Sequence, residues 1–181
     1  MNQLELISRP DDAWCRLLIC LRPPESIQQA IHDYLWLCHG LPEEGRTVAH
    51  RLHLTLLYCE RLHIDQLGAI QGTLAQVRFE PLKLDDFVPA PWDNGVAALL
   101  PAATGPIESL RRQVRVAARR AGIQALSRSP ETPHVTVARH RQRARPMPSL
   151  RMNWQCDAFE MVHSPAYPAP YVPIARYPSG T

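Results

Sequence analysis

The sequence has very little lysine, no paired-cysteine motif and no long apolar run. Lys83 is the one lysine among 20 basic residues, a bias that a GC-rich genome also produces. The five cysteines are odd in number and none has the spacing of a metal motif or disulfide framework, which fits a reducing compartment. No signal peptide is evident, and the apolar run Leu17–Leu21 is far too short to span a membrane. We therefore expect a cytoplasmic protein without membrane contact.

The composition is that of an ordinary globular protein. Of 181 residues, 45% are apolar and 20% are charged, so the chain can bury a core without a disulfide or a structural metal. The 18 prolines are dispersed, and they therefore mark turns and edge strands rather than a linker. We expect one domain over residues 1–181, made of two lobes, and a monomer.

Charge is divided unevenly along the chain. From Arg111 to Arg151 there are eleven arginines and one acid, Glu131, a net charge of +10, whereas the other residues sum to −7. This asymmetry predicts an anionic partner for the C-terminal half. The alternative is a solvated helix face followed by a basic loop.

Apolar periodicity and turn residues predict an irregular alternation of strands and helices with hairpins, which favours an α+β fold. One helix has Ile107, Leu110, Val114 and Ala118 inward and arginines outward, beginning with Arg111. Strands are expected at Trp14–Leu21, Leu52–Tyr58, Leu82–Val88, Val96–Leu100, His134–Ala138, Trp154–Val162 and Tyr171–Tyr177. Helices are expected from Pro23 to Cys38, from Leu67 to Val77 and from Ile107 to Ala121.

One short motif occurs twice. His53-Leu54-Thr55 and His134-Val135-Thr136 both read histidine, apolar, threonine, with apolar residues continuing each strand. Side chains at i and i+2 of a strand share a face, roughly 6.6 Å apart along the chain. Composition alone would give two copies in roughly one sequence in a hundred. We therefore predict that His53, Thr55, His134 and Thr136 form a catalytic site.

This pairing suits the in-line cleavage of a phosphodiester. The reaction needs a base on the attacking side and an acid on the leaving side, and two histidines can supply both near neutral pH. The threonine hydroxyls can donate to the non-bridging oxygens as charge builds on phosphorus. A histidine followed two residues later by a threonine is not a spacing typical of metal ligands, and no carboxylate accompanies either motif. We therefore expect no metal and no cofactor.

Two segments resemble the motifs of the 2H phosphoesterases, and most of all their RNA 2′,3′-cyclic phosphodiesterase branch, also called 2′-5′ RNA ligases. They are Leu52-His53-Leu54-Thr55-Leu56 and Thr132-Pro133-His134-Val135-Thr136-Val137-Ala138-Arg139. Weaker matches at Leu21-Arg22-Pro23-Pro24, Arg46-Thr47-Val48, Ser164 and Tyr171 extend the resemblance over nearly the whole chain. The family usually has Trp where Thr47 stands, Gly where Cys59 stands and Arg where His163 stands.

The resemblance implies a bilobal α+β fold, in which two antiparallel sheets face a central cleft with helices outside and one motif in each lobe. It implies hydrolysis of RNA 2′,3′-cyclic phosphate ends to 2′-phosphomonoesters without metal or ATP. It also implies that His53 is the general acid and His134 the general base. The partners would be RNA ends or nucleoside 2′,3′-cyclic phosphates.

Substrate-binding residues are expected around this cleft. Arg139 ends the second motif and could contact phosphate, Arg46 could reach the cleft mouth, and Tyr171 could stack on a base. Arg141 and Arg143, with Arg145, could follow an RNA backbone.

Three alternatives stay open at this stage. An RNA 5′-OH in place of water would make the same site an ATP-independent 2′-5′ RNA ligase. Another small cyclic phosphate could be the substrate, since Thr47 replaces the usual Trp. A non-catalytic RNA-binding module is the third, although a pure binder would not need imidazoles in both motifs.

Overall fold

The structure is a computed structural model that describes residues 13–37, 43–91, 95–123, 132–139 and 148–180. Within these ranges it has the expected α+β fold, with eight strands and three α-helices. No helix in the described ranges combines the length and the apolar character needed to cross a bilayer. In chain order the elements are β1 (Trp14–Leu21), α1 (Glu25–Leu37), β2 (Leu54–His63), α2 (Leu67–Leu74), β3 (Leu82–Pro91), β4 (Val96–Pro101), α3 (Gly105–Arg120), β5 (Val135–Arg139), β6 (Leu150–Cys156), β7 (Ala158–His163) and β8 (Val172–Pro178).

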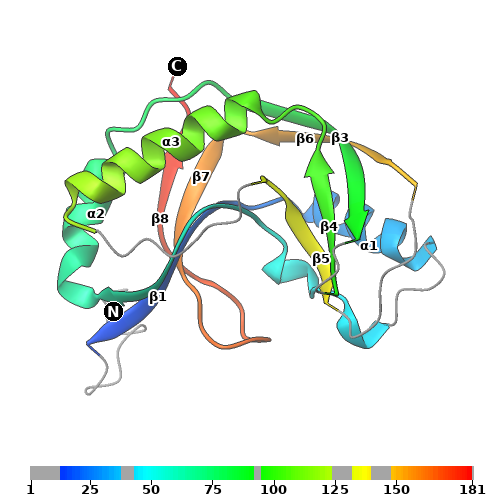
Figure 1. The fold of residues 1–181 in the computed structure, drawn as a ribbon, viewed down its shortest axis with the longest axis horizontal. Coiled ribbons are helices and arrows are strands. Elements are labelled where there is room, and N and C mark those ends of the chain that lie inside the picture. The colour runs from blue at the N-terminus through cyan, green and yellow to red at the C-terminus, as the bar shows by residue number, and fades with distance from the viewer. Residues whose placement is uncertain (1–12, 38–42, 92–94, 124–131, 140–147, 181) are drawn as a thin grey trace.

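The strands form one antiparallel sheet in the order β6-β3-β4-β5-β2-β1-β7-β8. Two four-stranded halves meet at its centre, where β2 and β5 are joined through one residue pair, Leu54 and Val135. The two sheets expected from the sequence are thus halves of a single, strongly bent sheet (Figure 1). Each motif lies at the start of one of the two central strands.

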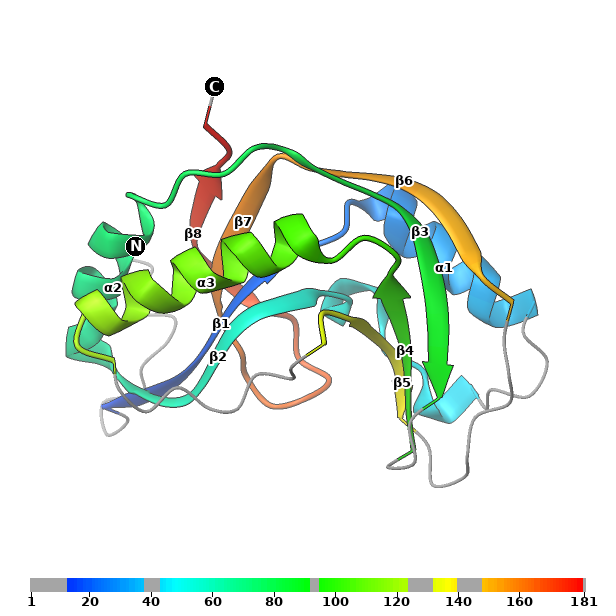
Figure 2. The same ribbon diagram turned by 45° about the horizontal axis from the view of Figure 1, so that its top comes forward.

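The helices cover one side of the sheet. α1 follows β1 in the chain and α3 follows β4, but each of these two helices packs against the other half of the sheet. α2 and α3 pack together, with α3 against β2, whereas α1 packs against β6 of the other half. Figure 2 shows α1 beside β3 and β6, and α3 lying across the half that holds β1 and β7. The halves are therefore interleaved along the chain rather than consecutive.

The α3 helix illustrates why these residues form these elements. The predicted inward stripe is buried, from Ile107 through Leu110 and Val114 to Ala118. The helix ends in a Schellman motif: Gly122 has φ +80°, and the N–H of Ile123 donates to the carbonyl of Ala118 at 3.0 Å. Arg111 is a correction to the sequence prediction, since it was expected outside and is buried.

Two predicted strands differ most from the structure. Trp154–Val162 was expected as one strand, but β6 ends at Cys156 and β7 begins at Ala158. β6 pairs with β3 in one half and β7 pairs with β1 in the other, so the chain must leave the first half at this point. β2 runs to His63 instead of Tyr58, because its pairing with β1 continues to Trp14.

Candidate active site

The register of the two central strands brings the motifs together. Leu54 pairs with Val135 in an antiparallel bridge, which sets His53 opposite Thr136 and Thr55 opposite His134. Leu54 and Val135 are fully buried in the core on the helix side. Because neighbouring side chains alternate between faces, the two histidines and two threonines share the other face, where all four are half-buried.

The two imidazoles are held in the same way. Nδ1 of His53 lies 2.8 Å from the carbonyl oxygen of Arg51, and Nδ1 of His134 lies 2.9 Å from that of Thr132. In each case the carbonyl belongs to the residue two positions earlier. A carbonyl only accepts, so Nδ1 carries the proton and donates it, and Nε2 is left with a lone pair for a substrate.

Burial keeps both histidines neutral in the free protein. It lowers the pKa of His53 to about 4, against the opposing effect of its hydrogen bond to the Arg51 carbonyl. The positive charges of Arg51, His134 and Arg139 lower this pKa further. The pKa of His134 is also lowered, by burial first and then by Arg139 and Arg111. Since His134 contributes to the lowered pKa of His53, the two imidazoles lie within electrostatic range of each other.

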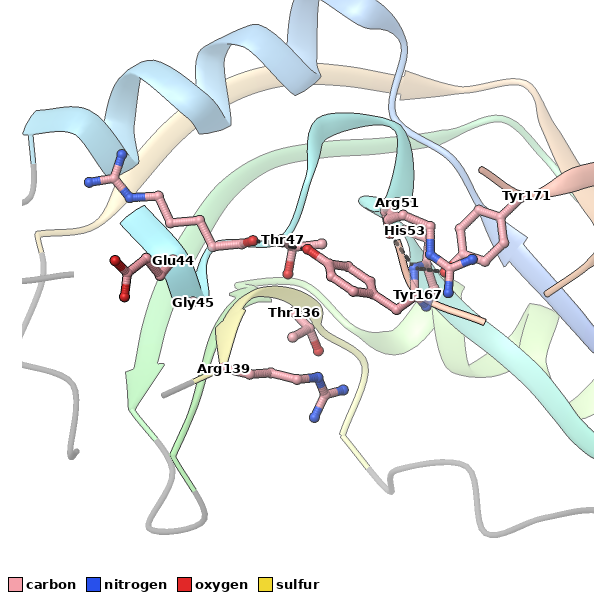
Figure 3. Close-up of a pocket in the computed structure, with 10 residues that line it drawn as sticks. Glu44, Gly45, Thr47, Arg51, His53, Thr136, Arg139, Tyr167 and Tyr171 are labelled. Atoms are coloured by element: carbon pink, nitrogen blue, oxygen red, sulfur yellow. Dashed lines mark hydrogen bonds between the residues drawn. The ribbon is translucent and has the colours of Figure 1, made fainter. Parts of the chain in front are cut away.

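A cavity of about 440 Å³ opens at this face. Of the predicted site residues, it is lined by Arg46, His53, Thr136, Arg139 and Tyr171. Figure 3 labels the last four of these. Thr55 and His134 are not among its lining residues but lie beside them through the strand register. Arg141 and Arg143 lie outside the described residues. The remaining lining residues are Glu44, Gly45, Thr47, Arg51 and Tyr167.

The segment before the first motif is tied to the second one. The N–H of Thr47 donates to the carbonyl of Val137 at 2.8 Å, and Arg46 forms a bridge with Ala138 of β5. Arg46 and Thr47 therefore reach the cavity from the side of the second motif. Arg139, exposed at the end of β5, extends its guanidinium toward the same space (Figure 3). A phosphate contact by Arg46 or Arg139 stays a prediction.

Sequence reasoning missed Arg51 and Tyr167. Arg51 is 9% exposed, and its guanidinium lies 4.1 Å from the ring centroid of Tyr171 and 5.9 Å from that of Tyr167. Both tyrosines come from the β7–β8 loop. The position of Arg51 two residues before His53 could have pointed to it, whereas no feature of the sequence pointed to Tyr167.

Tyr171 has a setting different from the one expected. It is 8% exposed, one ring face is covered by Arg51, and its hydroxyl lies 2.9 Å from Nδ1 of His53. Since that nitrogen carries a proton, the hydroxyl oxygen can accept a second branch of the Nδ1–H bond. Base stacking by Tyr171 stays a prediction, whereas contact with the histidine is what the structure contains.

The donor set around the cavity is not that of a metal site. In the part of the chain that the structure describes, no three His, Cys, Asp or Glu side chains gather in an arrangement that could hold an ion. The cavity is lined by three arginines and one carboxylate, Glu44. Such a balance favours an anion over a cation.

Comparison with known structures shows that the chain has the fold of the 2H phosphoesterases, as its two motifs predicted. Structures of E. coli LigT bound to 3′-AMP and in apo form match with TM-scores of 0.80 and 0.78, at 24% and 25% identity. These alignments cover 93% and 94% of this chain and 99% and 100% of LigT. TT0787 of Thermus thermophilus matches with a TM-score of 0.69 and 22% identity, over 90% of this chain and 97% of that one. No family model matches the sequence, and the search of curated proteins gives no match.

Proposed function

We propose that this protein is a phosphodiesterase of the 2H type that hydrolyses RNA 2′,3′-cyclic phosphate ends to 2′-phosphomonoesters. The observation that carries the proposal is the antiparallel register of the two motifs, which sets each histidine opposite the threonine of the other. Both imidazoles donate from Nδ1 to a backbone carbonyl, so both present Nε2 as the reactive nitrogen. LigT has been solved with 3′-AMP, ATP, NADP+ and phosphate, which supports a phosphate-bearing nucleotide as ligand of this fold.

In the proposed reaction, water attacks phosphorus in line with the bond to the 3′-oxygen. Nε2 of His134 takes a proton from the water as the new P–O bond forms. Nε2 of His53, in its protonated state, gives its proton to the 3′-oxygen as that bond breaks. The hydroxyls of Thr55 and Thr136 donate to the non-bridging oxygens, and Arg139 balances their charge. The product is a 2′-phosphomonoester with a free 3′-hydroxyl, and no metal takes part.

The test compares substrates and products directly. An oligonucleotide with a 2′,3′-cyclic phosphate end and the matching cyclic mononucleotides are incubated with the protein in EDTA, and 2′- and 3′-phosphates are resolved. We expect a 2′-phosphate product in EDTA. Loss of activity on chelation, restored by zinc or manganese, would contradict the metal-free mechanism. A joined product when a 5′-OH RNA is supplied would show that the site also performs ligation.

Variants of each histidine test the assignment of the site. His53→Ala and His134→Ala should each lower kcat by about 10²- to 10⁴-fold, the contribution of a positioned acid or base. His63→Ala is the matched control, because His63 lies at the far end of β2 and packs on Trp14 rather than in the cavity. Near-normal turnover by either cavity variant would mean that its motif is structural.

A further inference from the structure

Arg51 lies where three parts of the site meet. It precedes the first motif by two residues, it lines the cavity, and it is 9% exposed. Within the described ranges it forms no ion pair with a carboxylate. Burying a cation without a carboxylate partner costs free energy of desolvation, a cost that an apolar side chain at this position would not have. The contacts of the Arg51 side chain indicate what this cation does in the site.

The side chain of Arg51 holds the β7–β8 loop. One terminal nitrogen donates to the carbonyl of Ala169 at 3.0 Å, and both terminal nitrogens lie 3.4 Å from the carbonyl of Pro165. The guanidinium plane also covers the ring of Tyr171 and reaches that of Tyr167. One side chain thus fixes the loop backbone and the two aromatic rings that the loop brings to the cavity (Figure 3).

The main chain of Arg51 acts on His53 at the same time. Its carbonyl accepts the Nδ1–H bond, and the hydroxyl of Tyr171 lies 2.9 Å from the same nitrogen. The planes of the His53 and Tyr171 rings are perpendicular, in a T-shaped contact with centroids 5.4 Å apart. The backbone of Arg51 and the ring that its guanidinium covers therefore converge on one nitrogen of His53.

We propose that Arg51 is a positioning residue for His53, acting through Tyr171 and the β7–β8 loop. It gives and takes no proton; it fixes the direction of Nε2 toward the phosphate. The catalytic consequence rests on the proposed function, in which His53 protonates the leaving oxygen. The role requires arginine, because a planar guanidinium can stack on a ring and donate in its plane to two carbonyls together, whereas a lysine ammonium cannot.

The experiment uses the full chain with Arg51→Lys, which keeps the charge and removes the planar fork. Its kcat on a 2′,3′-cyclic phosphate should fall on the order of 10²-fold with little change in KM, the cost of a misplaced reacting group. In proton–nitrogen NMR, the Nδ1–H signal of His53 should be protected from exchange in the natural protein and broadened in the variant. This second measurement needs no activity.

A double-mutant cycle tests whether Arg51 acts through Tyr171. Tyr171→Phe keeps the ring and removes the hydroxyl, and the double variant should be no slower than the worse single variant. Arg61→Lys is the matched control, since Arg61 also stacks on a ring, that of Trp14 at 4.3 Å, at the far end of β2 and outside the cavity. It should retain the natural kcat and the protected signal. If Arg51→Lys does not fold, Tyr171→Phe tests the same link.

The outcomes separate this proposal from the proposed function. A protected Nδ1–H signal in Arg51→Lys overturns the positioning role, whatever the kcat, and so do additive effects in the cycle. A broadened signal supports it. If the natural protein cleaves no cyclic phosphate but the signal behaves as expected, the proposed function fails and the positioning role stands.

Discussion

Binding of a phosphate anion in the cavity should raise the pKa of His53. In the free protein this pKa is about 4, chiefly because of burial. At pH 7 only about one molecule in a thousand then carries the proton that the proposed acid must donate. An anion within about 4–6 Å of an imidazole favours its charged form and raises the pKa by about 1–3. The protonated fraction at pH 7 should rise by about tenfold or more on binding, in proportion to that shift.

The consequence is visible in kinetics because kcat/KM reports the free protein and kcat the complex. Donation of a proton is lost as pH rises above the pKa of the acid. The descending limb of kcat should therefore lie at higher pH than that of kcat/KM, by the same shift of about 1–3 pH units that the anion causes. The direct measurement is an NMR titration of His53 with and without a nucleoside 2′-monophosphate, at ionic strength matched with sodium chloride.

One result would refute this reasoning. If the phosphorus signal of the nucleotide shows that the cavity is saturated while the titration of His53 stays where it was, the anion does not lie at His53. Superimposed descending limbs in kcat and kcat/KM would lead to the same conclusion from kinetics. In either case the proton for the leaving oxygen would have to come from another group.

Three further outcomes are expected. Thr55→Ala and Thr136→Ala should each lower kcat by less than the histidine variants do, because the phosphate keeps other donors; a loss as large as that of His53→Ala would contradict this. The free energy of unfolding should decrease by up to about 3 kcal/mol as pH falls from about 6.5 toward 4, since the unfolded chain binds a proton that folded His53 does not. Urea unfolding at several pH values checks this, and the decrease should be smaller in His53→Gln. With a 3′-phosphorothiolate substrate, whose sulfur leaves without a proton, His53→Ala should regain most of its activity and His134→Ala should not; the reverse would exchange their roles.

Much of the fold follows from local pattern. The stripe from Ile107 to Val114 and the apolar run of β1 have the burial that their periodicity predicts. The error at Trp154–Val162 has a non-local cause, because the chain leaves one half of the sheet and enters the other at Asp157. The carbonyl of Asp157 accepts from Ser179 and its carboxylate from Arg176, both at the end of the chain. The sequence close to Asp157 does not show that the strand ends there, because both partners lie further along the chain.

The site, too, could be predicted only in part from the sequence. Spacing alone placed a histidine and a threonine on one face in each motif, because a strand alternates with period two. It could not show that Leu54 pairs with Val135, since that register depends on how the two halves of the sheet meet. Arg51 was missed because its partners, Pro165 and Ala169, lie more than a hundred residues further along the chain.

Locally, the two motifs are nearly equivalent: each histidine donates to the carbonyl two residues earlier and faces the threonine of the other strand. In-line displacement nevertheless needs two different partners, one that accepts a proton and one that gives it. The strands cannot make this distinction, so the surroundings must. The Nδ1–H of His53 is shared with the hydroxyl of Tyr171, and Arg51 holds that ring. Guanidinium charges lower the pKa of both histidines: Arg51 and Arg139 act on His53, and Arg139 and Arg111 act on His134. The guanidinium charges therefore do not separate the two histidines, whereas a hydroxyl that accepts from Nδ1–H stabilises the protonated imidazole of His53 once an anion is present, as the proposed acid requires. In the proposed reaction, Tyr171 and Arg51, which lie outside the motifs, would thus contribute to the difference in role between the two histidines.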